Sequence, residues 1–455
     1  MAGSNLRPSL LLPAFLAALL IAATAALGPA RPALADQCAF PFVPTAYEDL
    51  KDRELFLDTI DLAAFNMLFP GDPYFGLPDL EVGPRAARST VPGKIPPALL
   101  KSIGWIESSI TQAAGNVPFG AIGPALISFD CGHGVAQVTS GMTVATGESG
   151  RGSPEQALVA THFAYNIARG AVILASKWNE APENRPIAGT DNDADPQFME
   201  NWYFAVWSYN GFTGPGANRS NHPLDPIYGS WPRSPYSCGP TGDGKGHNRA
   251  NYPYQELVFG CAASPPIVDG APLWPAQAIT LPDLNDPVFR NALRLQNFVF
   301  PYVGMDIPTP QPAHTDATAA PSASLRNRIL GSPQLQVSKQ SVRVGYTPET
   351  GSITATVDVQ NGGTGVLAWY ASASVPWLKL LPYTGVAVGS NLPCARGSPC
   401  DRVGHMEISV DPVRAPAGLR NATVTLRALG TQEVVVINVE VSQVIRLGAP
   451  GITRN

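Results

Sequence analysis

The sequence predicts an α+β chain of several domains, in which a mainly α-helical domain at residues 36–305 precedes an all-β sandwich at residues 325–447. The spacing of the apolar residues predicts this division. It is helical before residue 305, and after residue 325 it becomes the alternation typical of β-strands. Between the two parts, residues 306–324 are mostly Pro, Ala, Thr and Ser, a composition typical of an extended linker that does not pack.

Length and composition indicate a globular protein. The 455 residues are enough for about two or three domains. Apolar residues make up 45% of the chain and charged residues only 14%, so the chain is able to bury a sizeable core. The net charge of −5 argues against a nucleic-acid partner, because nucleic-acid binding requires basic patches.

Residues 1–35 have the pattern of a secretory signal peptide. Arg7 supplies a positive charge, residues 10–27 are apolar, and Ala33-Leu34-Ala35 has small residues at the spacing that a signal peptidase requires. An uncleaved anchor is the alternative, because the apolar run approaches spanning length, but Gly28-Pro29 interrupts it and favours cleavage. We therefore expect a secreted or cell-envelope protein without a membrane span once the signal is removed.

The six cysteines fit the oxidising compartment that an exported protein enters. Six cysteines allow 15 pairings, so the sequence leaves the pairing open. The short intervening loops favour bridges between Cys394 and Cys400 and between Cys238 and Cys261, which would leave Cys38 to pair with Cys131. The absence of Cys-x-x-Cys spacing argues against a zinc or redox site, and we expect no metal and no cofactor.

Four segments of the first domain are expected to be helical: 46–69, 95–110, 153–178 and 201–212. Pro96 and Pro97 suit the first turn of the second segment. Ser153 and Gln156 form a capping-box pattern at the start of the third, and Gly211 ends the fourth. After the linker, about seven alternating segments in roughly 115 residues predict an antiparallel sandwich.

Glu107 is the candidate catalytic residue, because it is a single acid at the end of an apolar helix. The helix dipole disfavours a negative charge there, and the neighbouring Trp105 and Ile106 provide apolar surroundings. Both effects raise the pKa of a carboxyl group, and a protonated carboxyl is what a general acid needs to cleave a glycosidic bond. The alternative, which helix geometry alone favours, is that Glu107 only solvates the helix end.

Four short segments in this part of the chain have a recognisable order. They are Glu107-Ser108-Ser109, Gly134-Val135-Ala136-Gln137-Val138, Asn166-Ile167 with Gly170, and Ser208-Tyr209-Asn210-Gly211. Their order resembles that of the lysozyme-like lytic transglycosylases of the soluble type, which are related to goose-type lysozyme, and the resemblance covers about residues 95–212.

The resemblance implies a lysozyme-like domain that acts on peptidoglycan glycan strands and cleaves the bond between N-acetylmuramic acid and N-acetylglucosamine. It implies that Glu107 acts first as acid and then as base, giving 1,6-anhydromuramyl ends without a cofactor. It also implies that Gln137 hydrogen-bonds sugar and that the Tyr209 hydroxyl points toward Glu107. The remaining residues that it assigns to substrate binding are Ser108, Val138, Asn166 and Asn210.

Other interpretations of these segments remain open. Residues 134–138 have the composition of a buried strand or turn, and Tyr209 and Asn210 that of ordinary packing before a glycine. Asn166 either anchors its helix or hydrogen-bonds the substrate cleft. A Gly/Pro-rich insertion at 115–130 lengthens the gap after Glu107 beyond that expected of the family.

Asp130, at the end of this insertion, is the candidate second carboxylate. If it faces Glu107, a lysozyme-like hydrolase (a muramidase) becomes the alternative. Cys131 and His133 form a weaker candidate for a nucleophile with its base, or for metal ligands. A third alternative is a non-catalytic glycan-binding or scaffolding protein of the cell surface.

The second domain resembles the BACON-type immunoglobulin-like modules of secreted bacterial proteins, over about residues 334–445. The resemblance implies a contact with carbohydrate or the cell surface, with Trp377, beside a proline, as the candidate sugar platform. A structural spacer is the alternative that the residues favour, because Trp369 lies in an alternating strand and is expected to point inward.

Overall fold

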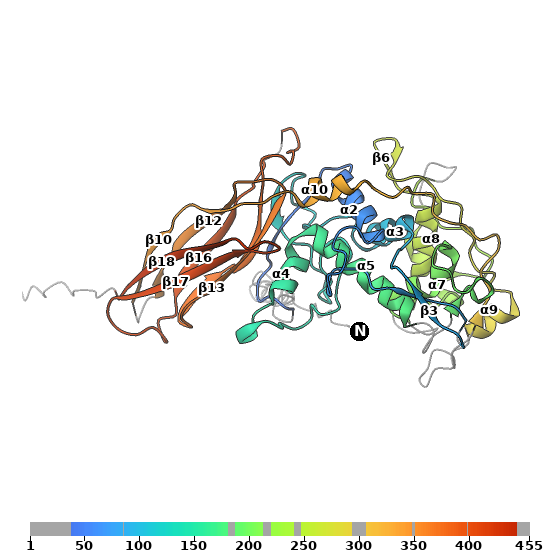
Figure 1. Cartoon of the computed structure of the whole chain (residues 1–455), viewed down its shortest axis with the longest axis horizontal. Helices are drawn as coiled ribbons and strands as arrows, with labels where there is room; N and C mark the ends of the chain where they lie inside the picture. The colour runs from blue at the N-terminus through green and yellow to red at the C-terminus, as the bar shows by residue number, and fades with distance from the viewer. Residues whose placement is uncertain are drawn as a thin grey trace, which may run out of the picture.

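The protein has a helical region and a β-sandwich, which lie side by side along the long axis of the molecule (Figure 1). The structure is a computed structural model that describes residues 38–84, 86–180, 187–212, 220–240, 247–293, 306–347, 351–397 and 399–443. The predicted signal peptide at 1–35 lies outside the described residues. The architecture is thus mixed α and β, as expected from the sequence.

The α-helices of the described residues are α2 (Glu54–Ala64), α3 (Pro97–Ser108), α4 (Pro154–Thr161), α5 (Phe163–Asn179), α7 (Tyr203–Tyr209), α8 (Tyr254–Ala263), α9 (Pro287–Ala292) and α10 (Ala323–Leu330). Short strands join parts of this region in the pairs β1 (Thr45–Tyr47) with β4 (Ile122–Pro124), β2 (Leu80–Val82) with β3 (Ser89–Val91), β5 (Ile187–Ala188) with β8 (Asp306–Ile307), and β6 (Ile267–Val268) with β7 (Ala271–Pro272). Short 3₁₀ turns include η4 (Met199–Trp202) and η6 (Arg249–Asn251).

Two expected helices differ in their bounds. The helix predicted at 46–69 begins only at Glu54, because residues 45–47 pair with β4. The helix predicted at 153–178 is divided at His162, whose extended backbone ends α4 and whose Nδ1 accepts a hydrogen bond from Ala164 N at the start of α5. The capping box of Ser153 and Gln156 is confirmed at the start of α4.

No single helix of the described residues is long and apolar enough to cross a bilayer. The bent pair of segments Glu148–Thr161 and Phe163–Asn179 passes the same criterion when the two are counted together, with a 95° angle between them.

The sandwich consists of two sheets of alternating strands. A six-stranded sheet has the order β11-β10-β18-β17-β13-β15, and a four-stranded sheet has the order β14-β16-β12-β9. The strands are β9 (Leu335–Val337), β10 (Ser341–Thr347), β11 (Gly351–Ile353), β12 (Ala355–Asn361), β13 (Val366–Ala373), β14 (Leu378–Leu381), β15 (Thr384–Val388), β16 (Gly404–Val410), β17 (Arg420–Ala428) and β18 (Val434–Gln443). The expected sandwich is confirmed, but it is not wholly antiparallel, since β10 and β18 pair in parallel.

Both tryptophans of the sandwich belong to its interior. Trp369 is 0% exposed, which confirms its predicted inward direction. Trp377 is only 9% exposed, so the expectation that it forms an exposed sugar platform is wrong. Its position at the start of β14 places the indole in the core, despite the neighbouring proline.

The segment 306–324 is not the free linker predicted from its composition. Ile307 pairs with β5, and the backbone N–H and side-chain hydroxyl of Thr309 both donate to Asp191 Oδ1 at 2.8 Å. Asp316 Oδ2 accepts a 2.6 Å hydrogen bond from Ala98 N in the first turn of α3. The expectation failed because composition does not reveal that backbone groups and short polar side chains find partners on the helical region.

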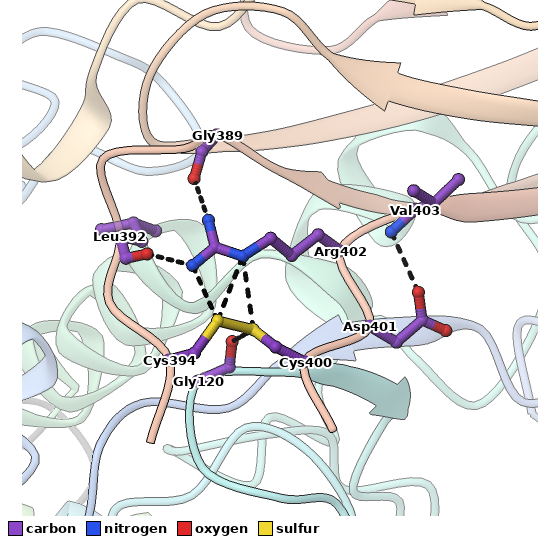
Figure 2. Close-up of a disulfide and its surroundings, with 8 residues drawn as sticks. All are labelled: Gly120, Gly389, Leu392, Cys394, Cys400, Asp401, Arg402 and Val403. Atoms are coloured by element: carbon purple, nitrogen blue, oxygen red, sulfur yellow. Dashed lines mark hydrogen bonds between the residues drawn. A yellow bond between two sulfur atoms is a disulfide. The ribbon is translucent and has the colours of Figure 1, made fainter. Parts of the chain in front are cut away.

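The sandwich is docked firmly on the helical region. Arg402 lies at this junction, where its guanidinium contacts the Cys394–Cys400 disulfide and donates to the carbonyl groups of Gly389 and Leu392 (Figure 2). On the helical side, Ile122 N donates to the carbonyl oxygen of Asp401 at 2.9 Å. One hydrophobic core extends through both regions.

All three favoured disulfides are present: Cys38–Cys131, Cys238–Cys261 and Cys394–Cys400. They are typical of proteins that fold in an oxidising compartment.

Candidate active site

Glu107 lies in the last turn of α3, and its carboxyl group meets the first residue of α8. The hydroxyl of Tyr254 donates a 2.5 Å hydrogen bond to Glu107 Oε1. Burial raises the pKa of Glu107 to about 7, against the lowering effects of the Tyr254 hydrogen bond and the positive charge of Arg249. The carboxyl group is therefore poised to carry a proton near neutral pH, as the helix-end position predicts.

The backbone that follows Glu107 ends α3 abruptly. Ser109 and Ile110 both have left-handed backbone angles, with φ of 58° and 54°. Their N–H groups donate back to the carbonyl groups of Trp105 and Gly104 in the last turn. A left-handed conformation is unfavourable for non-glycine residues, and two in succession mark a strained turn directly beside the candidate acid.

Residues 134–138 lie against this helix end. The hydroxyl of Ser108, the residue directly after Glu107, donates a hydrogen bond to the carbonyl oxygen of Val135 at 2.8 Å. This bond holds the segment 134–138 beside the helix end. Gly134 has φ of 63°, and a Cβ atom there would lie 2.3 Å from Gln112 Oε1, so no larger residue fits. The hydroxyl of Ser108 thus binds protein, and we assign it a positioning role in place of the predicted substrate contact.

Asn166 holds the same segment from α5. Its Oδ1 accepts from Ala136 N at 2.9 Å, and its Nδ2 donates to the carbonyl groups of His133 and Val159 at 2.7 and 3.0 Å. The side chain is 0% exposed. Of the two predicted roles, anchoring its helix and hydrogen-bonding substrate, the structure gives Asn166 the first.

Gln137 and Val138 differ in their access to the surface. Val138 is buried and its backbone pairs with His133, so its side chain is part of the core, and its predicted substrate contact stays a prediction. Gln137 is partly exposed, and its Nε2 donates to Gly134 O at 2.9 Å, while its side-chain oxygen has no donor among the residues that the structure describes. The predicted sugar contact of Gln137 stays a prediction.

Tyr209 does not hold Glu107, contrary to expectation. Its hydroxyl donates to the carbonyl oxygen of Ala136 at 2.7 Å. Burial and the nearby charge of Glu107 raise the pKa of Tyr209 well above its usual value, so the two side chains are close neighbours. Asn210 is exposed at the end of α7, where its Oδ1 is 3.4 Å from Asn221 Nδ2. Its predicted substrate contact is untested.

Two residues that act on Glu107 were not predicted: Tyr254 bonds its carboxyl group, and Arg249 bonds the neighbouring carbonyl oxygen of Ile106 and lowers the pKa of Glu107 through its charge. Both come from the stretch 247–263, about 140 residues after Glu107. The available signal was Pro253 followed by the apolar run "YQELVFGCAA", which is typical of a helix start. That pattern predicts α8 but gives no indication that its first residue lies against α3.

The structure gives little support to a second carboxylate that works together with Glu107. Asp130 is exposed, its Oδ1 accepts a 2.5 Å hydrogen bond from the Ser128 hydroxyl, and its charge is the smallest of the influences on the pKa of Glu107. The alternative based on Cys131 and His133 is excluded, because Cys131 is in a disulfide and His133 is fully buried. Burial also lowers the pKa of His133 to about 4.

The insertion at 115–130 leads away from Glu107 to the junction with the sandwich. Ile122–Pro124 of the insertion pairs with β1. The carboxylate of Glu48, directly after β1, accepts hydrogen bonds from the backbone of Gln112 and Ala113 at 3.1 and 2.9 Å. The insertion thus contributes to the contact between the two regions.

No family model matches this chain, and no curated protein matches it either. Solved structures with local similarity include a PapD-like domain of human CEP192 (10% identity, 24% of this chain, 84% of that chain, TM-score 0.19). The periplasmic chaperone SfaE has 11% identity over 26% of this chain and 60% of its own, with a TM-score of 0.20. The C. elegans MSP family member WR4 has 14% identity over 24% of this chain and 97% of its own, with a TM-score of 0.17. These similarities are too low to bear on function.

Proposed function

We propose that this protein is an exported peptidoglycan lytic transglycosylase that uses Glu107 as its single acid and base. One observation carries the proposal: burial gives Glu107 a pKa of about 7 at a helix end where Tyr254 bonds only one of its two carboxyl oxygens. Within the described residues, Oε2 receives no hydrogen bond from protein, and we assign it as the oxygen that gives and accepts the proton.

The first step needs the protonated acid. Glu107 donates its proton to the oxygen that links N-acetylmuramic acid to N-acetylglucosamine, and the bond from that oxygen to C1 of the muramyl residue breaks. The N-acetyl carbonyl oxygen of the same muramyl residue stabilises the positive charge at C1. Glu107 is left as a carboxylate, a form that the Tyr254 hydroxyl and the positive charge of Arg249 stabilise.

The second step returns the proton. The 6-hydroxyl of the muramyl residue attacks C1, and the carboxylate of Glu107 accepts the hydroxyl proton. A 1,6-anhydro bond forms, no water enters the product, and the enzyme regains its starting state. One titratable group with a pKa near the working pH suits both steps, because it gives and accepts a proton with similar ease.

The sandwich is proposed to be an immunoglobulin-like module with a structural role. Its candidate sugar platform, Trp377, is buried, and its surface is instead engaged with the helical region. Arg151 illustrates this engagement, since its guanidinium lies 3.8 Å from the centre of the Tyr383 ring. Three disulfides and the leader-like sequence at 1–35 support a place outside the cytoplasm.

Release of soluble fragments from purified peptidoglycan tests the proposal. Wild type is expected to release them, and Glu107→Gln to be slower by at least about a hundredfold. Glu48→Gln is the matched control, because Glu48 is also buried with a pKa raised to about 7, yet its carboxylate bonds only backbone. Binding of glycan without cleavage would favour the non-catalytic alternative.

A further inference from the structure

The guanidinium of Arg249 lies at the helix end that carries Glu107. Its Nη2 donates a 2.6 Å hydrogen bond to the carbonyl oxygen of Ile106, the residue before Glu107. The residue itself is exposed, and its positive charge acts on the Glu107 carboxyl group. A substrate that reaches Glu107 therefore passes a fixed positive charge.

Most of the donors of this guanidinium are free. An arginine has five N–H donors, and in the part of the chain that the structure describes Arg249 makes only the bond to Ile106 and no ion pair. Arg53 also bonds this helix end, but its guanidinium has additional partners. Its Nε donates to Ser109 O at 2.7 Å, and its charge is favoured by the nearby carboxylates of Glu48, Asp49 and Asp52.

The backbone that carries Arg249 is held in place. Asn248 Oδ1 caps η6 by accepting from Ala250 N at 3.0 Å. On either side of Arg249, the rings of His247 and Tyr252 stack at 5.8 Å, and Tyr236 packs against Tyr252 at 5.2 Å. The same stretch continues into α8, so one continuous segment of the chain carries both Arg249 and Tyr254 to the end of α3.

We propose that Arg249 binds a carboxylate carried by the muramyl residue that Glu107 cleaves. The planar guanidinium offers paired donors that match the two oxygens of a carboxylate, and among the described residues no carboxylate, Glu107 included, forms an ion pair or hydrogen bond with it. The inference rests on the proposed function, because it is peptidoglycan that brings an acid to this position.

Peptidoglycan offers two sources of that carboxylate. In strands without stem peptides, the lactyl group of each muramyl residue ends in a free carboxylate next to the reacting sugar ring. In intact strands this group is an amide, and the nearest carboxylates belong to the stem peptide. The alternative role for Arg249 is purely structural, as a cation that caps the C-terminal end of α3.

Cleavage rates on three substrates separate these possibilities. The substrates are intact strands, strands freed of their peptides by an amidase, and peptide-free strands whose lactyl carboxyl is converted to a methyl amide. Full-length wild type, Arg249→Gln, Arg249→Lys and the control Arg53→Gln are compared by the initial release of fragments. The control removes a different arginine from the same helix end.

Wild type is expected to cleave the strand with the recognised carboxylate at least about tenfold faster than the strand that lacks it. Arg249→Gln should lose this difference and Arg249→Lys should keep part of it, whereas Arg53→Gln should retain it in full. A preference for peptide-free strands assigns the lactyl carboxylate, and a preference for intact strands assigns the peptide carboxylate. Both support the proposal.

Equal rates of wild type on all three substrates would overturn this inference alone. So would an Arg249→Gln variant that is slower on all three by one common factor, because this is the behaviour of a structural cap. Failure of wild type to cleave any strand would instead overturn the proposed function, and the present inference with it.

Discussion

The hydroxyl of Tyr254 donates a 2.5 Å hydrogen bond to Oε1 of Glu107, across 147 positions of the sequence. This bond orients the carboxyl group and stabilises its ionised form, while burial stabilises the protonated form. The balance between the two gives Glu107 a pKa near neutrality. The bond therefore controls both the geometry and the proton affinity of the candidate acid.

Removal of this hydroxyl should change the pH dependence of cleavage. In wild type, activity should fall above a pH of about 7, because the reaction starts from protonated Glu107. In Tyr254→Phe the pKa of Glu107 rises, because the hydrogen bond that lowers it is lost, so the decrease in activity should begin at a higher pH. The maximal rate should also drop, by about 10- to 100-fold. In Tyr209→Phe, which loses a bond to Ala136 instead, the fall should stay near its wild-type position. An unshifted profile in Tyr254→Phe would contradict the assignment.

Stability should also respond to the titration of Glu107. Its pKa is raised from 4.5 to about 7 in the folded protein, so the folded state holds a proton that the unfolded state has lost in this range. The stabilisation is complete below pH 4.5 and disappears as pH rises through 7. Between pH 4.5 and 8, the free energy of unfolding of wild type, measured with denaturant, should decrease more than that of Glu107→Gln. The two decreases should differ by at most about 3 kcal/mol. Identical pH dependences would show that Glu107 has an ordinary pKa.

Gly170 should be necessary for the position of residues 134–138. A Cβ atom at residue 170 would lie 2.4 Å from Ala136 Cβ and 3.2 Å from the Tyr209 hydroxyl oxygen. Although Gly→Ala in a helix normally stabilises by about 1 kcal/mol, overpacking costs about 1–3 kcal/mol. We expect Gly170→Ala to lower both the unfolding free energy and the cleavage rate. Gly104→Ala is the control, since its Cβ would make contacts of 3.4 Å or longer. Equal behaviour of the two variants would contradict the close packing at Ala136.

Asp130 distinguishes the single-acid mechanism from that of a hydrolase with two carboxylates. Its side chain is exposed and bonded by Ser128, and its effect on the pKa of Glu107 is small. Asp130→Asn should therefore change the cleavage rate by less than about threefold and lower the pKa of Glu107 slightly. A loss of about a hundredfold would instead assign Asp130 a role in catalysis.

The period of the apolar residues was sufficient to predict α3, the helix end that carries Glu107 and the β-sandwich. Short loops favoured two of the three disulfides, Cys394–Cys400 and Cys238–Cys261, and the third, Cys38–Cys131, joins the two cysteines that remain. These features are local or depend on chain connectivity, so they leave a trace in the sequence. The raised pKa of Glu107 was predicted from its helix-end position and its apolar neighbours, whereas its main cause in the structure is burial by the surrounding fold.

Contacts between distant segments were not predictable. The break at His162 interrupts an apolar pattern that continues without change on both sides. The Pro-rich segment that contains Asp316 caps α3, a role that composition does not encode. The predicted partner of Glu107 was Tyr209 and the observed partner is Tyr254, and this difference has the same cause. Both tyrosines lie near the acid, and only the packing of α8 against α3 decides which hydroxyl reaches it.

Mass spectrometry of the muropeptides that the full-length protein releases from purified peptidoglycan tests the central claim most directly. If Glu107 acts alone as acid and base, the released strands end in 1,6-anhydromuramyl residues, one water lighter than reducing ends, and Glu107→Gln releases them at least about a hundredfold more slowly. Reducing muramyl ends would contradict the single-acid mechanism, and release by Glu107→Gln at the wild-type rate would contradict the assignment of the active site.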